Sequence, residues 1–226
     1  MTTHTHHHHE VSDADRRRLG RRAQRLAAAS VGYNLVEAVV ALSAGAIAGS
    51  IALIGFGLDS VVEVSSGLVI LWQFRHRLPQ SRERQAQRII ALSFFALAAY
   101  VGFESIRALI AGVGADASPV GVGLAIASLS LMPFLSFAQK RTGRALGSAA
   151  VVADGSQTAL CASLSAVLLV GLLLNATLGW SWADPVAALV IAAIAAREGV
   201  QTWRGKGCCA PGTHSEPDDA AAVGSA

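Results

Sequence analysis

The sequence is poor in charged residues. Asp, Glu, Lys and Arg make up only 15% of its 226 residues, and 53% of the residues are hydrophobic. Soluble domains carry roughly 25% charged residues, so a water-exposed surface of ordinary composition cannot be built from this chain. The shortage of charge excludes an ordinary soluble domain and indicates an integral membrane protein.

Strict alternation of polar and apolar residues over about 10 positions, which is typical of a transmembrane β-strand, is also missing. The chain instead has six apolar runs, each near the about 20 residues that cross a bilayer as a helix: 28–48, 50–73, 89–111, 119–138, 154–175 and 183–203. These runs predict an all-α integral membrane fold with six transmembrane helices in one domain, 28–203. A His- and Arg-rich segment, 1–27, precedes that domain, and a tail expected to be disordered, 204–226, follows it.

Cysteine and histidine are too few and too scattered for a disulfide framework or for intramembrane catalysis. Of the three cysteines, Cys161 lies inside an apolar run, while Cys208 and Cys209 lie in a tail expected to face a reducing cytoplasm. All seven histidines lie outside the apolar runs. Five of them fall within residues 1–10, where a purification tag and a native metal-collecting tail are both open. We therefore expect neither an enzyme nor a prosthetic group.

Positive charge is missing from three of the loops. The loops near Gly45, Asp116 and Trp180 contain no Lys or Arg, and seventeen of the eighteen basic residues fall on the opposite side of the predicted membrane. The positive-inside rule then places both termini in the cytoplasm, as for a multi-pass protein of a bacterial-type inner membrane. We interpret the net charge of +3 as a topology signal with anionic lipid headgroups as partners, and not as a sign of nucleic-acid binding.

Two acidic residues interrupt the second apolar run far from either end. Asp59 and Glu63 lie within residues 50–74, SIALIGFGLDSVVEVSSGLVILWQF. A carboxylate at mid-bilayer costs about 2.5–3.5 kcal/mol, and a spacing of four residues places both side chains on one helix face. Two acids on one face at this depth require a positive charge beside them. The pair predicts half of a cation site.

Other polar residues fall at similar depth in the first and fifth runs. Glu37 follows Asn34 by three residues, so it is either a packing residue bonded to Asn34 and nearby hydroxyls or a participant in the cation site. Gln157 and Cys161 are four apart and share a face. Gln157 alone could instead make an interhelical hydrogen bond, and Cys161 could be a small core residue.

Three further acids are given local roles. Glu104 and Arg107, at i and i+3, are expected to form an ion pair. Asp154 is expected at a helix start as an N-cap. Asp184 is expected to cap the sixth helix, with Pro185 at its first helical position.

Together these residues resemble the cation diffusion facilitators, the six-helix divalent-metal exporters. The similarity covers roughly residues 30–203 and is strongest at GSIAL (49–53), DSVVE (59–63), AD (153–154) and WADP (182–185). The resemblance implies a tetrahedral divalent cation, Zn²⁺ or another, held at mid-membrane by the acids of the second helix and a pair on the fifth. It also implies exchange of the metal for protons by alternating access.

The chain departs from the family in two respects. The fifth-helix pair, often His and Asp in the family, falls on Gln157 and Cys161. The family's cytoplasmic metal-binding and dimerising domain is expected to be missing, so a homodimer would form through transmembrane helices. Two carboxylates and a thiolate nevertheless suit Zn²⁺, with a carbonyl oxygen from Gln157 and a carboxylate from Glu37 as further donors. Without the sulfur, an oxygen-only site would suit Mn²⁺ or Fe²⁺ better.

Two functions follow. The first is export of a divalent cation, zinc before others, from the cytoplasm by proton antiport, since ligands must lose protons to bind metal. The alternative is a membrane partner subunit or metal sensor that keeps the transporter fold without transporting. The altered fifth-helix pair motivates this alternative.

Overall fold

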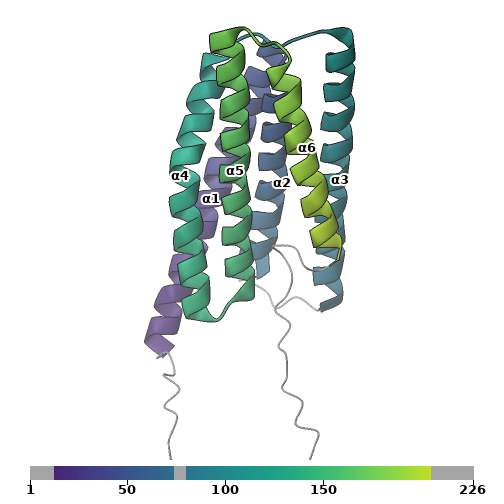
Figure 1. The fold of residues 1–226 in the computed structure, drawn as a ribbon. Helices are drawn as coiled ribbons and strands as arrows, with labels where there is room; N and C mark the ends of the chain where they lie inside the picture. Colours follow the sequence, from purple (N-terminus) through teal and green to yellow (C-terminus); the bar gives the residue numbers. More distant parts are fainter. Residues whose placement is uncertain (1–12, 74–79, 205–226) are drawn as a thin grey trace, which may run out of the picture.

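The computed structural model describes residues 13–73 and 80–204, and these form six helices and no strand. In chain order the helices are α1 (Asp13–Ala48), α2 (Ile51–Gln73), α3 (Gln80–Ala111), α4 (Pro119–Leu146), α5 (Ala149–Leu178) and α6 (Ala183–Trp203). They stand side by side in one bundle (Figure 1). The prediction of an all-α, six-helix fold is confirmed. The histidine-rich start, most of the C-terminal tail and Pro79 lie outside the described residues.

Five of the six helices are long and apolar enough to cross a membrane. The qualifying segments are Arg17–Ala48, Ile51–Leu68, Arg88–Ala111, Pro119–Leu146 and Val151–Leu178. The bundle wall exposes large hydrophobic side chains such as Ile110 and Phe134, which are 83% and 77% exposed. Such a wall fits lipid and not water. α6 is shorter, with 21 residues, and carries Asp184, Arg197 and Glu198.

The helices pack in three neighbouring pairs, α1 with α2, α3 with α6, and α4 with α5, and α2 also contacts α3, α5 and α6. Small residues allow the close approach of α1 to α2. A Cβ on Gly57 would lie 3.0 Å from the backbone nitrogen of Leu42, so a larger residue there would push the helices apart. The most buried side chains, among them Phe56, Leu168 and Ile191, fill the space between the pairs.

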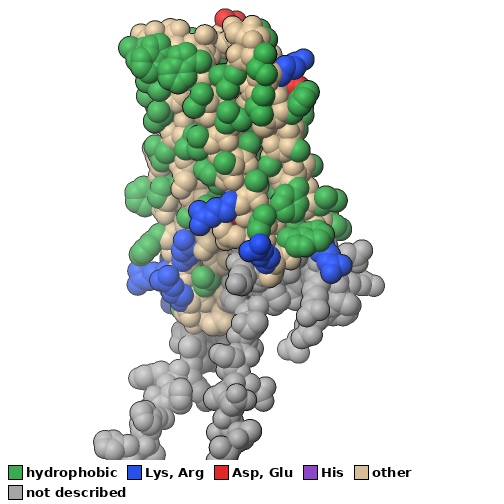
Figure 2. Space-filling view, turned by 45° about the vertical axis from the view of Figure 1, so that its right-hand side comes forward, with side chains coloured by type: hydrophobic (Ala, Val, Ile, Leu, Met, Phe, Trp, Pro, Cys, Tyr) green, Lys and Arg blue, Asp and Glu red, His purple; other side chains and the backbone are tan. Residues whose placement is uncertain are grey.

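The basic residues are concentrated at one end of the bundle. α1 begins and α6 ends toward the lower end of the bundle in Figure 1. Lys and Arg side chains gather toward that same end in Figure 2, below a largely hydrophobic wall. We call the opposite end, with the α1–α2, α3–α4 and α5–α6 connections, the outer end, after the predicted orientation. The expected ion pair between Arg107 and Glu104 is confirmed, with an N–O distance of 2.7 Å.

Two predicted helix caps are wrong. α5 begins at Ala149 and is capped by Ser148, whose hydroxyl accepts from the Val151 N–H, so Asp154 lies in the second turn and not at the start. The cause is that the residues between Ser148 and Asp154 continue the helix. At α6, Trp182 is the N-cap residue and makes no side-chain cap. Asp184 instead bonds to a different helix, α2.

Candidate metal centre

Asp59 and Glu63 lie one turn apart on α2, which contacts α1, α3, α5 and α6. At 1.5 Å per residue they are about 12 Å and about 18 Å from the outer end of α2. Their side chains are 4% and 6% exposed. The Glu63 carboxylate accepts a 2.6 Å hydrogen bond from the side-chain amide of Asn34 on α1. Both acids are therefore buried near the middle of the bundle, as the sequence predicted.

Glu37 on α1 meets α2 and α5 at one carboxylate oxygen. Its Oε2 accepts a 2.9 Å hydrogen bond from the hydroxyl of Ser60 and a 3.6 Å bond from the thiol of Cys161. Both Glu37 and Cys161 are fully buried. The packing interpretation of Glu37 expected bonds to nearby hydroxyls and to Asn34. The first is present, from Ser60, whereas Asn34 bonds to Glu63 instead.

Gln157 connects α5 to α2. Its side-chain carbonyl oxygen accepts a 3.0 Å hydrogen bond from the hydroxyl of Ser66, which is the interhelical bond anticipated for this residue. One turn further along α5, Cys161 bonds to Glu37, so this part of α5 contacts both α2 and α1.

The five predicted residues thus come together in one buried polar layer, defined here as Glu37, Asp59, Glu63, Gln157 and Cys161 and contributed by α1, α2 and α5. Ser60, which follows Asp59 on α2, bonds to Glu37, and Glu37 bonds to Cys161. Ser66, three residues after Glu63, bonds to Gln157. In the described part of the chain, no Lys or Arg forms an ion pair with these acids. The layer therefore holds three carboxyl groups and a thiol without a basic partner among the described residues.

The layer is not arranged as a closed coordination sphere. Among the described residues, no three His, Cys, Asp or Glu side chains converge as a metal-binding group. The structure holds two linked pairs, Asn34 with Glu63 and Glu37 with Cys161. Several buried oxygens nevertheless lack a hydrogen-bond partner within the described residues, including Oδ1 of Asn34, Oε1 of Glu37 and Oγ of Ser128. These oxygens can therefore still accept a hydrogen bond or coordinate a cation.

Three residues near the layer carry no predicted role in it. Gln139 on α4, fully buried, donates a 2.6 Å hydrogen bond to Asp154 on α5. Asp154 lies within electrostatic range of Glu63, and Glu198 on α6, 7% exposed, lies within range of Asp59. In the sequence, all three are polar residues near the end of an apolar run. That position alone does not distinguish a buried polar residue from one exposed to solvent at a helix end.

Comparison with known proteins supports the architecture. A family model described as the cation efflux transmembrane domain matches residues 27–205. The chain is 28% identical over 179 residues to a Synechocystis protein named uncharacterized transporter sll1263, covering 75% of this chain and 58% of that protein. It is 27% identical over 167 residues to the magnetosome protein MamB of a Magnetospira species, covering 70% of this chain and 57% of that protein. The chain therefore spans less than two thirds of the length of these two relatives.

Proposed function

The chain belongs to the cation efflux family, and from this premise we propose that it exports a divalent metal cation, zinc before others, from the cytoplasm in exchange for protons. The observation that carries the proposal is the buried polar layer. Three carboxylates and a thiol lie together near the middle of a membrane bundle, without a described basic partner. Buried charge of this kind is expensive in a bilayer and is retained where ions or protons pass.

We assign the cation to Asp59, Glu63 and Cys161, with Gln157 and Glu37 as further donors. Carboxylate oxygen and thiolate sulfur are both ligands that Zn²⁺ accepts, and the sulfur disfavours Mg²⁺ and Ca²⁺, which prefer oxygen. Closing the sphere requires the Cys161 thiol to lose the proton that it donates to Glu37, whereas Glu63 can offer the ion a lone pair that Asn34 does not use. Because these are single hydrogen bonds, the layer can rearrange around an ion without unfolding a helix.

Proton coupling follows from the chemistry of the same groups. A carboxyl or thiol must lose its proton to bind metal, so the metal and the protons compete for one set of atoms. Protons arriving from the outer side would displace the metal there. The inner, lower-proton side would favour metal binding. The exchange needs no additional cofactor.

The alternative is a membrane partner subunit or metal sensor without transport. Its specific support is that no three described acids, cysteines or histidines converge as a metal-binding group. A sensor can bind metal with slow exchange, whereas a transporter must also release the metal on the far side.

The deciding experiment measures zinc flux into proteoliposomes loaded with a zinc-sensitive dye. With an acidic interior, outward proton movement should drive zinc inward, and an ionophore that collapses the gradient should stop the uptake. Asp116→Asn is the control for the layer variants, since Asp116 is an exposed acid in the loop between α3 and α4, away from the layer. Zinc binding without gradient-driven uptake would favour the partner or sensor function.

A further inference from the structure

The carboxylate of Asp184, the second residue of α6, lies on the start of α2. It accepts hydrogen bonds from the hydroxyl of Ser50, from the backbone N–H of Ile51 at 2.9 Å, and from the N–H of Ala52 at 3.4 Å. Ser50 is itself the cap of α2, because its hydroxyl oxygen accepts from the Leu53 N–H at 3.0 Å. Asp184 is only 1% exposed. One carboxylate therefore completes the cap of another helix.

This contact is of a strong kind. The first N–H groups of a helix have no partner within the helix, and the positive end of the helix dipole attracts an anion. Hydrogen bonds to an ionised acceptor are about twice as strong as neutral ones. Asp184 therefore fastens the beginning of α6 to the beginning of α2, and α2 carries Asp59 and Glu63.

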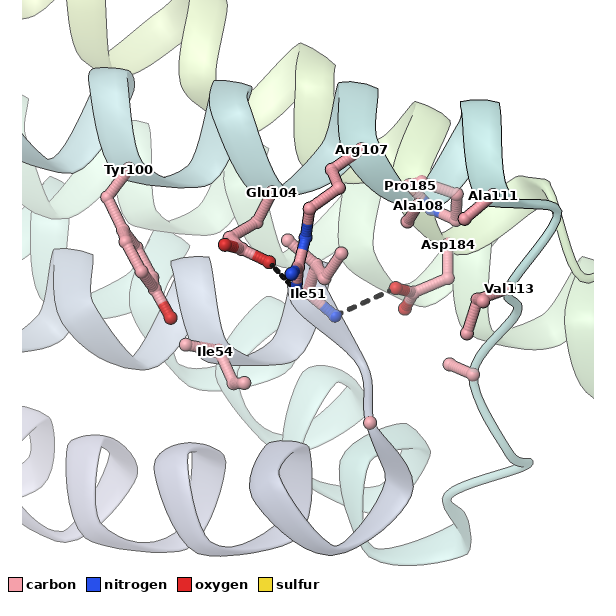
Figure 3. Close-up of a pocket in the computed structure, with 12 residues that line it drawn as sticks. Ile51, Ile54, Tyr100, Glu104, Arg107, Ala108, Ala111, Val113, Asp184 and Pro185 are labelled. Atoms are coloured by element: carbon pink, nitrogen blue, oxygen red, sulfur yellow. Dashed lines mark hydrogen bonds and ion pairs between the residues drawn. The ribbon is translucent and has the colours of Figure 1, made fainter.

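A cavity of about 600 Å³ lies directly beside this contact. Ile51 and Asp184 line one side of it, and Tyr100, Glu104 and Arg107 of α3 line another, as Figure 3 shows. The turn after α1 and the loop after α3 contribute further lining residues, so the cavity belongs to the outer end of the bundle. Its charged lining residues are Asp184, Glu104 and Arg107, of which the last two are paired with each other, and its other lining residues are mostly apolar.

The other connections at this end join different parts. The Asp116 N–H donates to the Ala48 carbonyl at 2.9 Å, and the Asn175 amide donates to the Ala115 carbonyl at 2.8 Å. These bonds tie the α3–α4 loop to α1 and α5. Among the hydrogen bonds of the described residues, those of the Asp184 carboxylate join the start of α6 to the start of α2.

We infer that Asp184 is a latch at the outer end, which holds α2 against α6 and separates the buried polar layer from the outer cavity. When the latch is released, the cavity becomes the vestibule through which the cation leaves. The inference rests on the proposed function for the identity of the cargo. The latch itself is a statement about access and can be tested without transport. Asp184 acts here as a positioning residue and not as a ligand.

Ala188 provides the reporter position. It lies four residues after Asp184, on the same face of α6 and one turn deeper, and it is fully buried. Ala188→Cys is placed in a protein in which Cys208 and Cys209 are serine. The rate of its labelling by a membrane-impermeant maleimide, applied from the outer side, measures how often the outer end opens. The same protein without Ala188→Cys gives the background from Cys161.

The latch is weakened in two independent ways, by Asp184→Asn and by Ser50→Ala. Both should raise the labelling rate by about tenfold or more, the change expected from losing a hydrogen bond to a charged group. Ser118→Ala is the matched control, because Ser118 caps α4 at the same end by accepting from the Gly121 N–H at 3.1 Å, without joining α2 to α6.

Unchanged labelling in both latch variants would overturn the inference, as would an equal increase in Ser118→Ala, which would indicate general loosening. If Asp184→Asn does not fold, Ser50→Ala carries the test, since it leaves the carboxylate in place. The readout is labelling and not flux. A chain that binds metal without transporting it can therefore still confirm the latch, and a transporting chain can still refute it.

Discussion

The side-chain amide of Asn34 on α1 donates a 2.6 Å hydrogen bond to the carboxylate of Glu63 on α2. The bond joins two helices at a proposed metal ligand, and the other side-chain atom of Asn34, Oδ1, has no hydrogen-bond partner within the described residues. Asn34 therefore supports Glu63 when no cation is present. A cation bound at Glu63 would take over that role.

Asn34→Leu keeps the approximate size of the side chain and removes the donor. We expect the metal-free protein to lose about 1–2 kcal/mol of stability, the range for interhelical hydrogen bonds in membranes. We also expect zinc to restore more stability to this variant than to wild type, because the metal replaces the missing donor. Thermal unfolding in detergent, with and without zinc, measures both effects.

Asn175→Leu is the control for Asn34→Leu. The Asn175 side chain on α5 also donates a hydrogen bond to another part of the bundle, the Ala115 carbonyl of the α3–α4 loop, at 2.8 Å. This bond lies at the outer end, away from the layer. Asn175→Leu should lower stability without changing the response to zinc. An identical zinc response in Asn34→Leu and Asn175→Leu would show that Asn34 has no connection to the metal.

Asp59→Asn and Glu63→Gln remove the negative charges of α2 with little change of shape. Each should reduce zinc-dependent flux at least about tenfold, since a buried charged ligand contributes well over 1.4 kcal/mol to holding a divalent ion. The Asp116→Asn protein should keep its flux. Undiminished transport by both α2 variants would make these acids structural.

The apparent zinc affinity of the layer should rise with pH. Each ligand that binds metal must first release its proton, so fewer bound protons mean tighter metal binding. Zinc titrations of the detergent-solubilised protein between about pH 5.5 and 8 test the sign, and proton release on metal addition in weakly buffered solution gives an independent measure. Zinc affinity that does not change with pH would remove the basis for antiport.

Hydropathy predicts the helices well because each apolar run is close to the thickness of the bilayer. It predicts some inner ends poorly: α1 begins at Asp13, whereas the apolar run begins at 28. The runs 50–73 and 183–203, in contrast, end where α2 and α6 end. The added turns of α1 are rich in Arg and Ala, which are good helix formers, so the helix continues after the apolar signal ends. Hydropathy reports contact with lipid, and helix propensity decides where the helix stops.

The contacts within the site are harder to predict than the site itself. A spacing of four residues places Asp59 and Glu63 on one face of α2, and that prediction needs only the geometry of a single helix. Which residue of α1 meets Glu63 depends on the rotation of α1 against α2, which the sequence pattern does not fix. The bond of Asp184 is equally hard to predict, because its partner Ser50 is 134 positions away in the sequence. Rules for helix caps consider only residues that are close in sequence.

Cys161 gives the sharpest test of the metal itself. Its thiol is fully buried and donates to Glu37 at 3.6 Å, so in the described arrangement it is bonded to an acid of the layer. As a thiolate it would prefer Zn²⁺ and Cd²⁺ over Mn²⁺. Cys161→Ser keeps the approximate size and the hydrogen-bond donor but offers a hard oxygen in place of sulfur. Cys161→Ala removes both the donor and the ligand atom.

Titration of the three metals against wild type, Cys161→Ser and Cys161→Ala separates the two roles of this residue. A ligand role predicts that affinity falls about tenfold or more for zinc and cadmium and much less for manganese, in both variants. Bound zinc should also protect Cys161 from alkylation. A packing role predicts equal losses for all three metals or no loss, because an effect on packing does not distinguish soft metals from hard ones. That result would leave Glu37, which shares the contact, as the better candidate for the remaining ligand.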